Sequence, residues 1–185
     1  MNFSENAVLL IIDVQKGFSD TVFGKRNNLN AEANIQQLIE VWRNNKRPVI
    51  FIQHASKLLE SPFYPNKPGY VLQNEIKPRP DELLIVKNEN SAFVNTDLEA
   101  HLKTRGLRDI VTVGLTTDHC VSTTVRMGQN LGFNMFVVAD ATATFDRIDY
   151  QGKLYPAQTM HEINLASLHK EFATIIDTAA ILKSQ

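Results

Sequence analysis

The 185-residue sequence predicts a single-domain α/β fold around a mostly parallel β-sheet, spanning residues 1–185. Short apolar runs alternate with longer amphipathic stretches along the chain. The runs are apolar at consecutive positions, which is typical of parallel strands covered by helices on both faces. No repeat, low-complexity block or linker interrupts this alternation, so one domain is expected.

Six apolar runs are the predicted strands. They are Ala7–Ile12, Pro48–Gln53, Leu83–Val86, Asp109–Gly114, Asn134–Ala139 and Phe172–Ile176. Helix-length stretches separate most of them, which predicts crossover connections and therefore parallel neighbours in the sheet.

Five stretches have helical character. They are Asn30–Asn45, Thr96–Arg105, Cys120–Leu131, Thr159–Lys170 and Asp177–Lys183. In the first, Ile35, Leu38 and Trp42 recur at helical spacing, which predicts one buried face. Gly106 and Gly132 follow the second and third stretches, where a helix commonly ends.

The segment from His54 to Glu82 differs from the rest of the chain. It holds five prolines together with Phe63, Tyr64 and Tyr70, and it is too long to be a simple connection. Loops of this length in compact domains are usually functional or disordered. The aromatic side chains favour a loop packed over a site.

Composition excludes several classes of function. The formal net charge is −1 and the pI is about 6.5, so no basic field is available for nucleic acid or an anionic membrane. A single cysteine cannot form an internal disulfide, and the first apolar run is too short to span a bilayer. We therefore expect a cytoplasmic protein whose partner is a small-molecule substrate.

Motifs for cofactors and metals are missing from the sequence. There is no glycine-rich dinucleotide or nucleotide fingerprint, so no cofactor is expected. The five histidines show no metal-ligand spacing, and no second cysteine is available. The sequence therefore predicts no metal site.

Polar residues at the ends of three predicted strands are the candidates for chemistry. Asp13 follows VLLII, Lys87 follows LLIV, and the turn GLTTDHC, which contains Cys120, follows IVTV. In open parallel sheets, ligands bind beyond the carboxyl ends of the strands, where the winding reverses. The three residues are therefore expected to meet at one edge of the sheet.

Each of these residues also has an ordinary structural explanation. Cys120 fits a small buried apolar side chain, and equally a nucleophile whose thiolate is stabilised at a helix N-terminus. Asp13 fits a turn cap, and Lys87 a solvated strand end. Alternatively, the Lys87 ammonium pairs with both the carboxylate and the sulfur and holds both ionised. These residues alone leave the two readings open.

Four segments resemble, in order, the motifs of the isochorismatase-like cysteine hydrolases. They are LLIIDVQKGF, KNENSAFVNTDLEAHLKTRG, IVTVGLTTDHCVSTTVRMGQNLGF and VVADATATF, and they span nearly the whole chain. The resemblance implies a three-layer α/β/α fold with a six-stranded, Rossmann-like sheet, often assembled as a dimer or larger homo-oligomer. It also implies a catalytic triad of Asp13, Lys87 and Cys120.

The same resemblance implies a mechanism. A cis peptide bond between Leu115 and Thr116 would direct the Thr116 and Cys120 N–H groups to one point as an oxyanion hole. Asp13 would accept the thiol proton, with Lys87 as its charge partner, and a Cys120 thioester would form. The implied reaction is hydrolysis of an amide-type C–N bond.

The resemblance also bears on the substrate. Isochorismatases that cleave a vinyl ether characteristically lack the cysteine, so its presence favours an amidohydrolase. Nicotinamidases carry an Asp-x-His metal motif after the second strand, where this chain has FIQHAS, which argues against a metal and against nicotinamide. The residues suggested to line the substrate pocket are Phe18, His54, Tyr64 and Phe93, although the three aromatics fit the core equally well.

Two alternatives remain at this stage. One is an isochorismatase-type vinyl-ether hydrolase that uses only Asp13 and Lys87. The other is a non-enzymatic small-molecule-binding or redox-sensing domain with one thiol of low pKa. The sequence does not identify the substrate or the oligomeric state, because Trp42, Leu58 and Leu59 fit a partner interface or a core.

Overall fold

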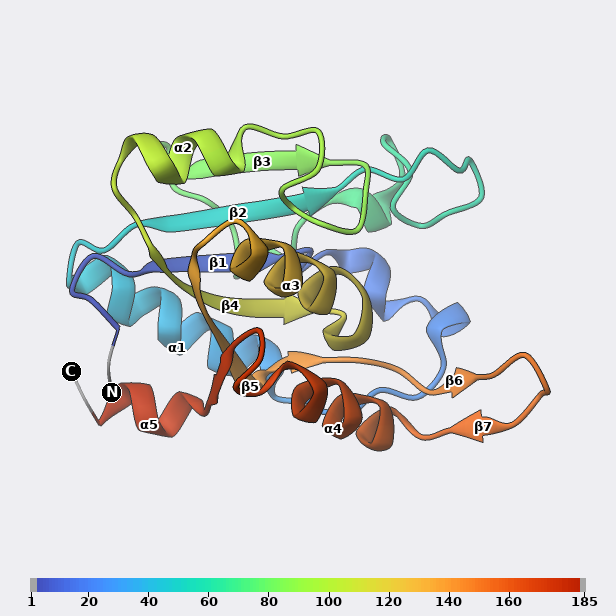
Figure 1. The fold of residues 1–185 in the computed structure, drawn as a ribbon. Coiled ribbons are helices and arrows are strands. Elements are labelled where there is room, and N and C mark those ends of the chain that lie inside the picture. The colour runs from blue at the N-terminus through green and yellow to red at the C-terminus, as the bar shows by residue number, and fades with distance from the viewer. Residues whose placement is uncertain (1–2, 184–185) are drawn as a thin grey trace.

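A six-stranded parallel sheet forms the centre of the computed structural model, which describes residues 3–183 (Figure 1). Its strands are β1 (Val8–Ile12), β2 (Val49–His54), β3 (Leu83–Lys87), β4 (Asp109–Leu115), β5 (Asn134–Ala143) and β8 (Thr174–Ile176). They lie in the order β3-β2-β1-β4-β5-β8, and every neighbouring pair is parallel. The predicted α/β fold is confirmed.

Helices cover both faces of this sheet. They are α1 (Ala31–Asn44), α2 (Leu98–Thr104), α3 (Ser122–Asn130), α4 (Ala157–Leu168) and α5 (Thr178–Leu182). Leu9 and Ile11 pack into one core with α1 and α5, while Leu10 and Ile12 pack into a second core with α2, α3 and α4. Figure 1 shows α1 and α3 on opposite faces, which gives the three layers.

One predicted strand is only half covered. In β3, Leu83 and Ile85 pack against the second core, whereas Leu84 and Val86 are exposed. The expectation that all strands are buried on both faces is therefore wrong for β3. The reason is its position, because an edge strand has a neighbour on one side only.

Several segments differ from the predicted elements. A short antiparallel hairpin of β6 (Arg147–Ile148) and β7 (Leu154–Tyr155) projects from the body beyond β5 and was not predicted (Figure 1). The helix expected from Cys120 begins two residues later, because Thr117–Val121 forms a π-helical turn, η4. Three single-turn 3₁₀ helices complete the fold: η1 (Lys16–Ser19), η2 (Thr21–Phe23) and η3 (Pro68–Tyr70).

The strand order creates a crevice between β1 and β4. From β1 the chain proceeds outward through β2 and β3 on one side, and later through β4, β5 and β8 on the other. The crossover connections therefore diverge at the carboxyl ends of β1 and β4, which is where open α/β sheets bind ligands. This is the edge at which the sequence places its candidate residues.

The proline-rich segment packs against this edge. The Gln15 side chain accepts from His54 N at 2.9 Å and donates to Tyr70 O at 2.7 Å. The backbones at Gly17 and Gly69 approach so closely that a Cβ on Gly69 would lie 2.8 Å from Gly17 Cα. The segment thereby closes one side of the crevice, as its aromatic content predicted. No helix within residues 3–183 is long and apolar enough to cross a membrane.

Gly114 is required where β4 passes β1. Its φ is +115°, and a Cβ there would lie 2.0 Å from Ile12 O. We expect Gly114→Ala to lower the free energy of unfolding by about 3 kcal/mol or more, because both a backbone clash and a disfavoured φ result. Urea denaturation followed by circular dichroism measures this loss.

Gly132→Ala is the matched control, since φ is +87° but no atom lies within 4 Å of the added Cβ. This variant should lower the free energy of unfolding by only about 1–2 kcal/mol, because alanine is disfavoured in the left-handed conformation. Equal losses in the two variants would contradict the importance of the close approach between β1 and β4.

Candidate active site

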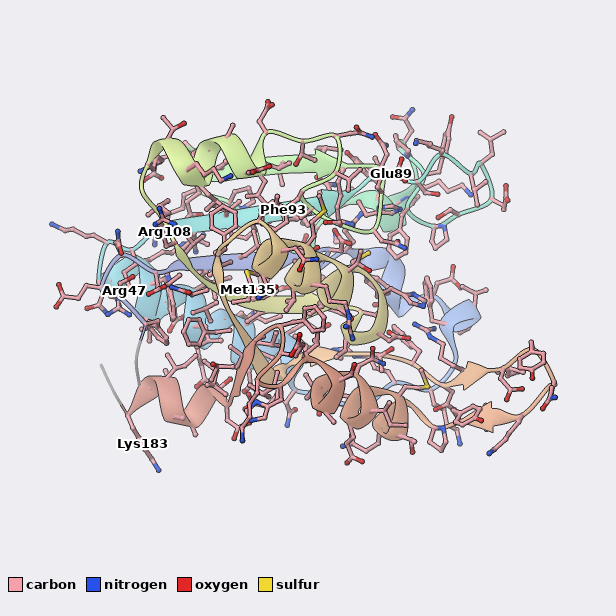
Figure 2. All side chains as sticks on the ribbon, in the orientation of Figure 1. Arg47, Glu89, Phe93, Arg108, Met135 and Lys183 are labelled. Atoms are coloured by element: carbon pink, nitrogen blue, oxygen red, sulfur yellow. The ribbon has the colours of Figure 1, made fainter. Side chains whose placement is uncertain are left out.

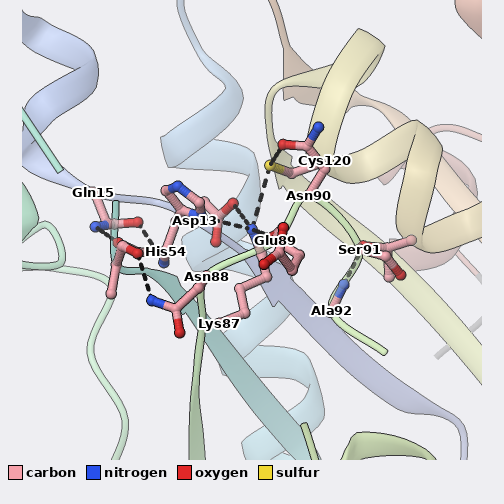
Figure 3. A network of polar contacts seen from close by, with 12 residues as sticks. Asp13, Gln15, His54, Lys87, Asn88, Glu89, Asn90, Ser91, Ala92 and Cys120 are labelled. Atoms are coloured by element: carbon pink, nitrogen blue, oxygen red, sulfur yellow. Dashed lines mark hydrogen bonds and ion pairs between the residues drawn. The ribbon is translucent and has the colours of Figure 1, made fainter. Parts of the chain in front are cut away.

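The three candidate residues meet around the Lys87 ammonium group (Figure 3). Lys87 Nζ lies 2.7 Å from Asp13 Oδ2 and 3.3 Å from Cys120 Sγ. The Lys87 and Asp13 side chains are 0% and 1% exposed. The structure therefore brings together three residues that are far apart in the sequence, at the sheet edge expected for them.

The fold determines how each of these side chains is positioned in the site. Asp13 directly follows β1 with φ +52°, a left-handed conformation that aspartate tolerates better than most residues. Lys87 ends β3 in register with His54 on β2, so its long side chain must pass the end of β2 to reach Asp13. Cys120 lies in η4, the turn that connects β4 to α3.

The ammonium group has more acceptors than protons. Besides Asp13 and Cys120, Lys87 Nζ lies 3.2 Å from Glu89 O and 3.4 Å from His54 Nδ1. Burial opposes its charge, but the Asp13 carboxylate and the Cys120 sulfur raise the pKa of Lys87 above its usual value. Lys87 and Asp13 thus form a buried ion pair.

Burial and a neighbouring negative charge both oppose ionisation of the cysteine. Burial raises the pKa of the Cys120 thiol to about 12, the Asp13 charge contributes in the same direction, and Lys87 opposes both. The expectation that Lys87 holds the sulfur ionised stays a prediction, which the raised pKa of the Cys120 thiol does not favour. Burial outweighs the ammonium, and α3 begins only at Ser122, after the cysteine.

Asp13 retains a free acceptor next to the thiol. Its Oδ2 atom is taken by Lys87, whereas Oδ1 is buried and has no hydrogen-bond partner among the described residues. A buried oxygen without a partner is costly unless another group binds it. Oδ1 can therefore receive a proton from sulfur or a hydrogen bond from a substrate N–H.

The turn that carries Cys120 is fixed by its neighbours. The Leu115–Thr116 peptide bond is cis, and Thr117 Oγ1 lies 2.9 Å from His161 Nδ1 on α4. Asp118 accepts from Arg147 Nε at 2.7 Å and from the Thr144 hydroxyl at 2.5 Å. Although burial opposes its charge, these hydrogen bonds lower the pKa of Asp118 to about 2.

A small cavity of about 180 Å³ opens beside the sulfur. Asp13, Thr116 and Cys120 form its reactive side. Its apolar wall consists of three phenylalanines, Phe18, Phe23 and Phe63. A larger hollow of about 960 Å³ is lined by β5, β8 and the loops that precede these two strands, and by none of the residues beside the sulfur.

The suggested pocket residues divide into two groups. Phe18 and His54 line the cavity, as expected. Phe93 does not, because it is buried in the second core and stacks on Phe133 at 5.6 Å (Figure 2). Tyr64 does not line the cavity either, because its neighbour Phe63 points inward and packs on Phe18 at 4.6 Å.

Sequence reasoning missed five residues that line the cavity, namely Phe23, Phe63, Asn90, His119 and Arg147. Asn90 and His119 lie inside the quoted motifs KNENSAF and GLTTDHC, so their positions beside Lys87 and Cys120 were a usable signal. The thiol lies 3.8 Å from Asn90 Oδ1. Phe23 ends the single-turn helix η2, Phe63 lies in a loop and Arg147 in a two-residue strand; these segments are too short for a period to indicate which side chain points inward.

His54 contributes a neutral imidazole. Burial lowers its pKa, and the nearby Lys87 charge lowers it further, so the ring can accept a hydrogen bond from Lys87 at Nδ1. Within residues 3–183, no three His, Cys, Asp or Glu side chains are grouped closely enough to hold a metal ion.

Comparison with known proteins agrees with the fold and the sequence motifs. A family model described as "Isochorismatase domain" matches residues 7–180. The uncharacterized isochorismatase family protein YrdC of Bacillus subtilis is 46% identical over 178 residues, which cover 96% of this chain and 95% of YrdC.

Two further relatives are informative. A crystal structure of an isochorismatase-family protein from Chromobacterium violaceum is 37% identical, has a TM-score of 0.96, and covers 100% of this chain and 96% of its own. Nicotinamidase 3 of Arabidopsis thaliana is 28% identical over 201 residues, covering 98% of this chain and 89% of the relative.

The raised pKa of Cys120 predicts slow alkylation. A shift from 9.0 to about 12 lowers the thiolate fraction at neutral pH about a thousandfold, so iodoacetamide should label the native protein far more slowly than the urea-unfolded chain. Asp13→Asn removes a negative charge beside the sulfur and should accelerate labelling. Mass spectrometry of the single cysteine measures both rates.

Fast labelling of the native protein near pH 7, at the rate of an ordinary free thiol, would contradict this assignment. It would favour the low-pKa thiol of the non-enzymatic alternative.

The ion pair of Asp118 and Arg147 predicts an acid-dependent contribution to stability. The pKa of Asp118 falls from 3.8 to about 2 on folding, so its contribution is fully present above about pH 4 and is lost as the pH falls through 2. We expect Asp118→Asn to lower the free energy of unfolding by about 1–2 kcal/mol at pH 6, a value reduced for partial solvent screening. Near pH 2 the substitution should change it by almost nothing.

Urea unfolding of both proteins across this pH range measures the difference. Glu60→Gln, which changes an exposed carboxylate, is the control and should alter stability by less than about 0.5 kcal/mol. A cost for Asp118→Asn that is independent of pH would count against the ion pair.

Proposed function

The chain belongs to the isochorismatase family, and from that membership we propose that it is a cysteine amidohydrolase acting on a small molecule. Members of this family are hydrolases and include amidases that act on C–N bonds. One observation carries the proposal. The thiol of Cys120 lies in a cavity beside the Asp13 carboxylate, which forms an ion pair with Lys87.

The first step is attack by sulfur on the amide carbon. Because the thiol is neutral at rest, its proton moves to Asp13 Oδ1 as the S–C bond forms. Lys87 remains protonated, and its N–H shifts toward the sulfur as negative charge develops there. Asp13, held by Lys87, thus acts as the base, and the Cys120 nucleophile need not be charged in the resting enzyme.

The tetrahedral oxyanion then requires donors. We assign the backbone N–H groups of Thr116 and Cys120, since both residues line the cavity; Thr116 directly precedes the turn η4 and Cys120 lies in it. In other enzymes the loss of one such donor costs about 2.7–4 kcal/mol of transition-state stabilisation.

Collapse of this intermediate breaks the C–N bond. Protonated Asp13 transfers its proton to the departing nitrogen, which leaves as ammonia or an amine, and the acyl group remains on Cys120 as a thioester. Water then attacks the thioester and gives one proton to Asp13, and that proton returns to sulfur as the carboxylic acid departs. The net reaction consumes one water for each amide bond cleaved.

The relatives support the type of bond that is cleaved, and they do not identify the substrate. Nicotinamidase 3 is named for an amide substrate. This chain lacks an Asp-x-His sequence at the end of β2, where it has Gln53, His54 and Ala55. We therefore propose amide hydrolysis for this chain, and we do not propose nicotinamide as its substrate.

A trapped thioester is the direct test of this proposal. The protein is mixed with a library of small amides, quenched in acid within milliseconds to seconds, and analysed by intact mass and peptide mapping. We expect an acyl adduct on Cys120 that disappears as substrate is consumed. Amide turnover without any adduct, and with full activity in Cys120→Ala, would contradict the thioester mechanism. Full activity of Cys120→Ala on isochorismate would instead favour ether hydrolysis of the isochorismatase type.

Substitutions in the triad should separate chemistry from folding. Cys120→Ser and Asp13→Asn should each lower kcat/KM by at least about 10³-fold, because each removes a group needed in the transition state. Steady-state assays of ammonia release measure the loss, and circular dichroism checks the fold.

Lys87→Met should also reduce stability, since it leaves the buried Asp13 charge without its partner. The double variant Asp13→Asn/Lys87→Met removes both charges and is the matched control. It should recover much of the stability and none of the activity. Recovery of activity in this double variant would contradict the role of the pair.

A further inference from the structure

A hollow without any of the proposed catalytic residues lies at the opposite edge of the sheet from Cys120. Its volume is about 620 Å³, and it is bordered by the beginnings of β2 and β3 and by the last turns of α1 and α2. Figure 2 shows Arg47 near this edge and Glu89 near the carboxyl ends of the strands. A molecule bound in this hollow would therefore not touch the site of the proposed reaction.

Basic side chains dominate the lining of this hollow, which we call the cationic hollow. Its cations are Arg43, Lys46, Arg47, Arg79 and Arg105. With histidine counted as neutral, these five cations face two carboxylates, Asp81 and Glu82, whereas the whole chain has a formal net charge of −1. The hollow therefore concentrates positive charge on a protein whose overall charge is slightly negative.

Both oxygens of one of these carboxylates are already engaged. Glu82 accepts from Arg43 Nε at 2.8 Å, from Arg43 Nη2 at 2.7 Å and from Arg79 N at 2.7 Å. Although burial opposes its charge, these hydrogen bonds lower the pKa of Glu82. Among residues 3–183, the cations of the hollow that form no salt bridge are Lys46, Arg47, Arg79 and Arg105.

Arg47 is held by aromatic rings instead of a carboxylate. Its guanidinium carbon lies 5.5 Å from the centre of the Trp42 ring and 5.9 Å from that of Phe3. Its Nη1 atom is buried and has no hydrogen-bond partner in the described part of the chain. A buried donor without a partner is costly, and so is a cation without a counter-charge nearby. An anion in the hollow would supply that counter-charge.

Helix dipoles explain only part of this arrangement. Basic side chains are favourable at the C-terminal end of a helix, which accounts for Arg43 in the last turn of α1 and Arg105 directly after α2. Arg47 and Arg79 lie in loops, where no helix dipole acts on them in this way. Their presence on the same hollow therefore points to a ligand.

We propose that the cationic hollow binds a small anion with linked phosphate groups, such as pyrophosphate or the phosphate chain of a nucleotide. A guanidinium group donates two parallel hydrogen bonds to phosphate oxygens, and Arg47, Arg79 and Arg105 supply three such groups without a carboxylate partner. A phosphate group has three terminal oxygens, so neighbouring guanidinium groups can share it more readily than they share a carboxylate.

The charge distribution favours a small anion over a large one. Several positive charges in one hollow favour an anion of several negative charges. An extended nucleic acid is a poorer match, because the net charge of −1 provides no attraction over the rest of the surface. This inference does not rest on the proposed reaction.

Titration calorimetry with pyrophosphate, in metal-free buffer of constant ionic strength, tests this assignment. The variants are Arg79→Gln and Arg105→Gln, whose side chains are exposed, so the fold should tolerate both changes. Arg108→Gln is the matched control, because Arg108 is an exposed arginine at the same edge of the sheet that does not line the cationic hollow (Figure 2). Citrate is the comparison that carries several carboxylates in place of phosphates, and ATP is the comparison that carries its phosphates on a nucleoside.

The wild-type protein should bind pyrophosphate saturably. Arg79→Gln and Arg105→Gln should each weaken this binding about tenfold or more, because a charge-assisted hydrogen bond is lost. Arg108→Gln should change it by less than about twofold, and citrate should bind about tenfold more weakly than pyrophosphate. Tighter binding of ATP than of pyrophosphate would identify a nucleotide as the source of the phosphates, and weaker binding a free polyphosphate; both results support the proposal.

Other outcomes overturn the inference. Absence of saturable binding at millimolar pyrophosphate would exclude the site, and unchanged binding in both Arg79→Gln and Arg105→Gln would place the anion elsewhere on the protein. Equal weakening by Arg108→Gln would reduce the effect to net charge, and citrate binding as tight as that of pyrophosphate would exclude a phosphate site. Because the titration contains no amide substrate, none of these results bears on the proposed function.

Discussion

The buried ion pair between Lys87 and Asp13 is the interaction on which the rest of the site depends. Both side chains are almost completely removed from solvent, and such a pair persists only where geometry and further hydrogen bonds offset the loss of hydration. Lys87 must begin at the end of the edge strand β3 and pass β2 to meet Asp13 at the end of β1. The sheet order, the left-handed turn at Asp13 and the packed proline-rich segment all serve this contact.

The pair also decides where reactivity resides. Burial raises the pKa of the Cys120 thiol, and the Asp13 carboxylate keeps a free acceptor atom at Oδ1. Nucleophilicity then depends on proton transfer during attack rather than on a standing thiolate. We expect such a thiol to resist adventitious alkylation and oxidation, because both reactions need the thiolate. The fixed turn η4, tied to Thr144 and Arg147 through Asp118, keeps the sulfur in place for that transfer.

Sequence patterns predicted those parts of the structure that have a physical period or boundary. Consecutive apolar residues identify the six strands, and polar residues at strand ends identified Asp13, Lys87 and Cys120 before the coordinates did. The cavity wall was predicted poorly, because its residues come from loops without periodicity. Tyr64 and Phe63 are adjacent, and only tertiary packing decides that the phenylalanine points inward. Arg147 lies in a strand of two residues, which is too short to leave a pattern.

The protonation state of the single cysteine tests the central claim most directly. Infrared spectroscopy of the resting protein at neutral pH resolves the S–H stretching band, and Cys120→Ser identifies it, since the chain has no other thiol. We predict a clear S–H band in the wild type that persists until strongly alkaline pH and is absent from Cys120→Ser. A wild-type protein without this band at neutral pH would hold a thiolate. The buried pair would then charge the sulfur at rest instead of accepting its proton.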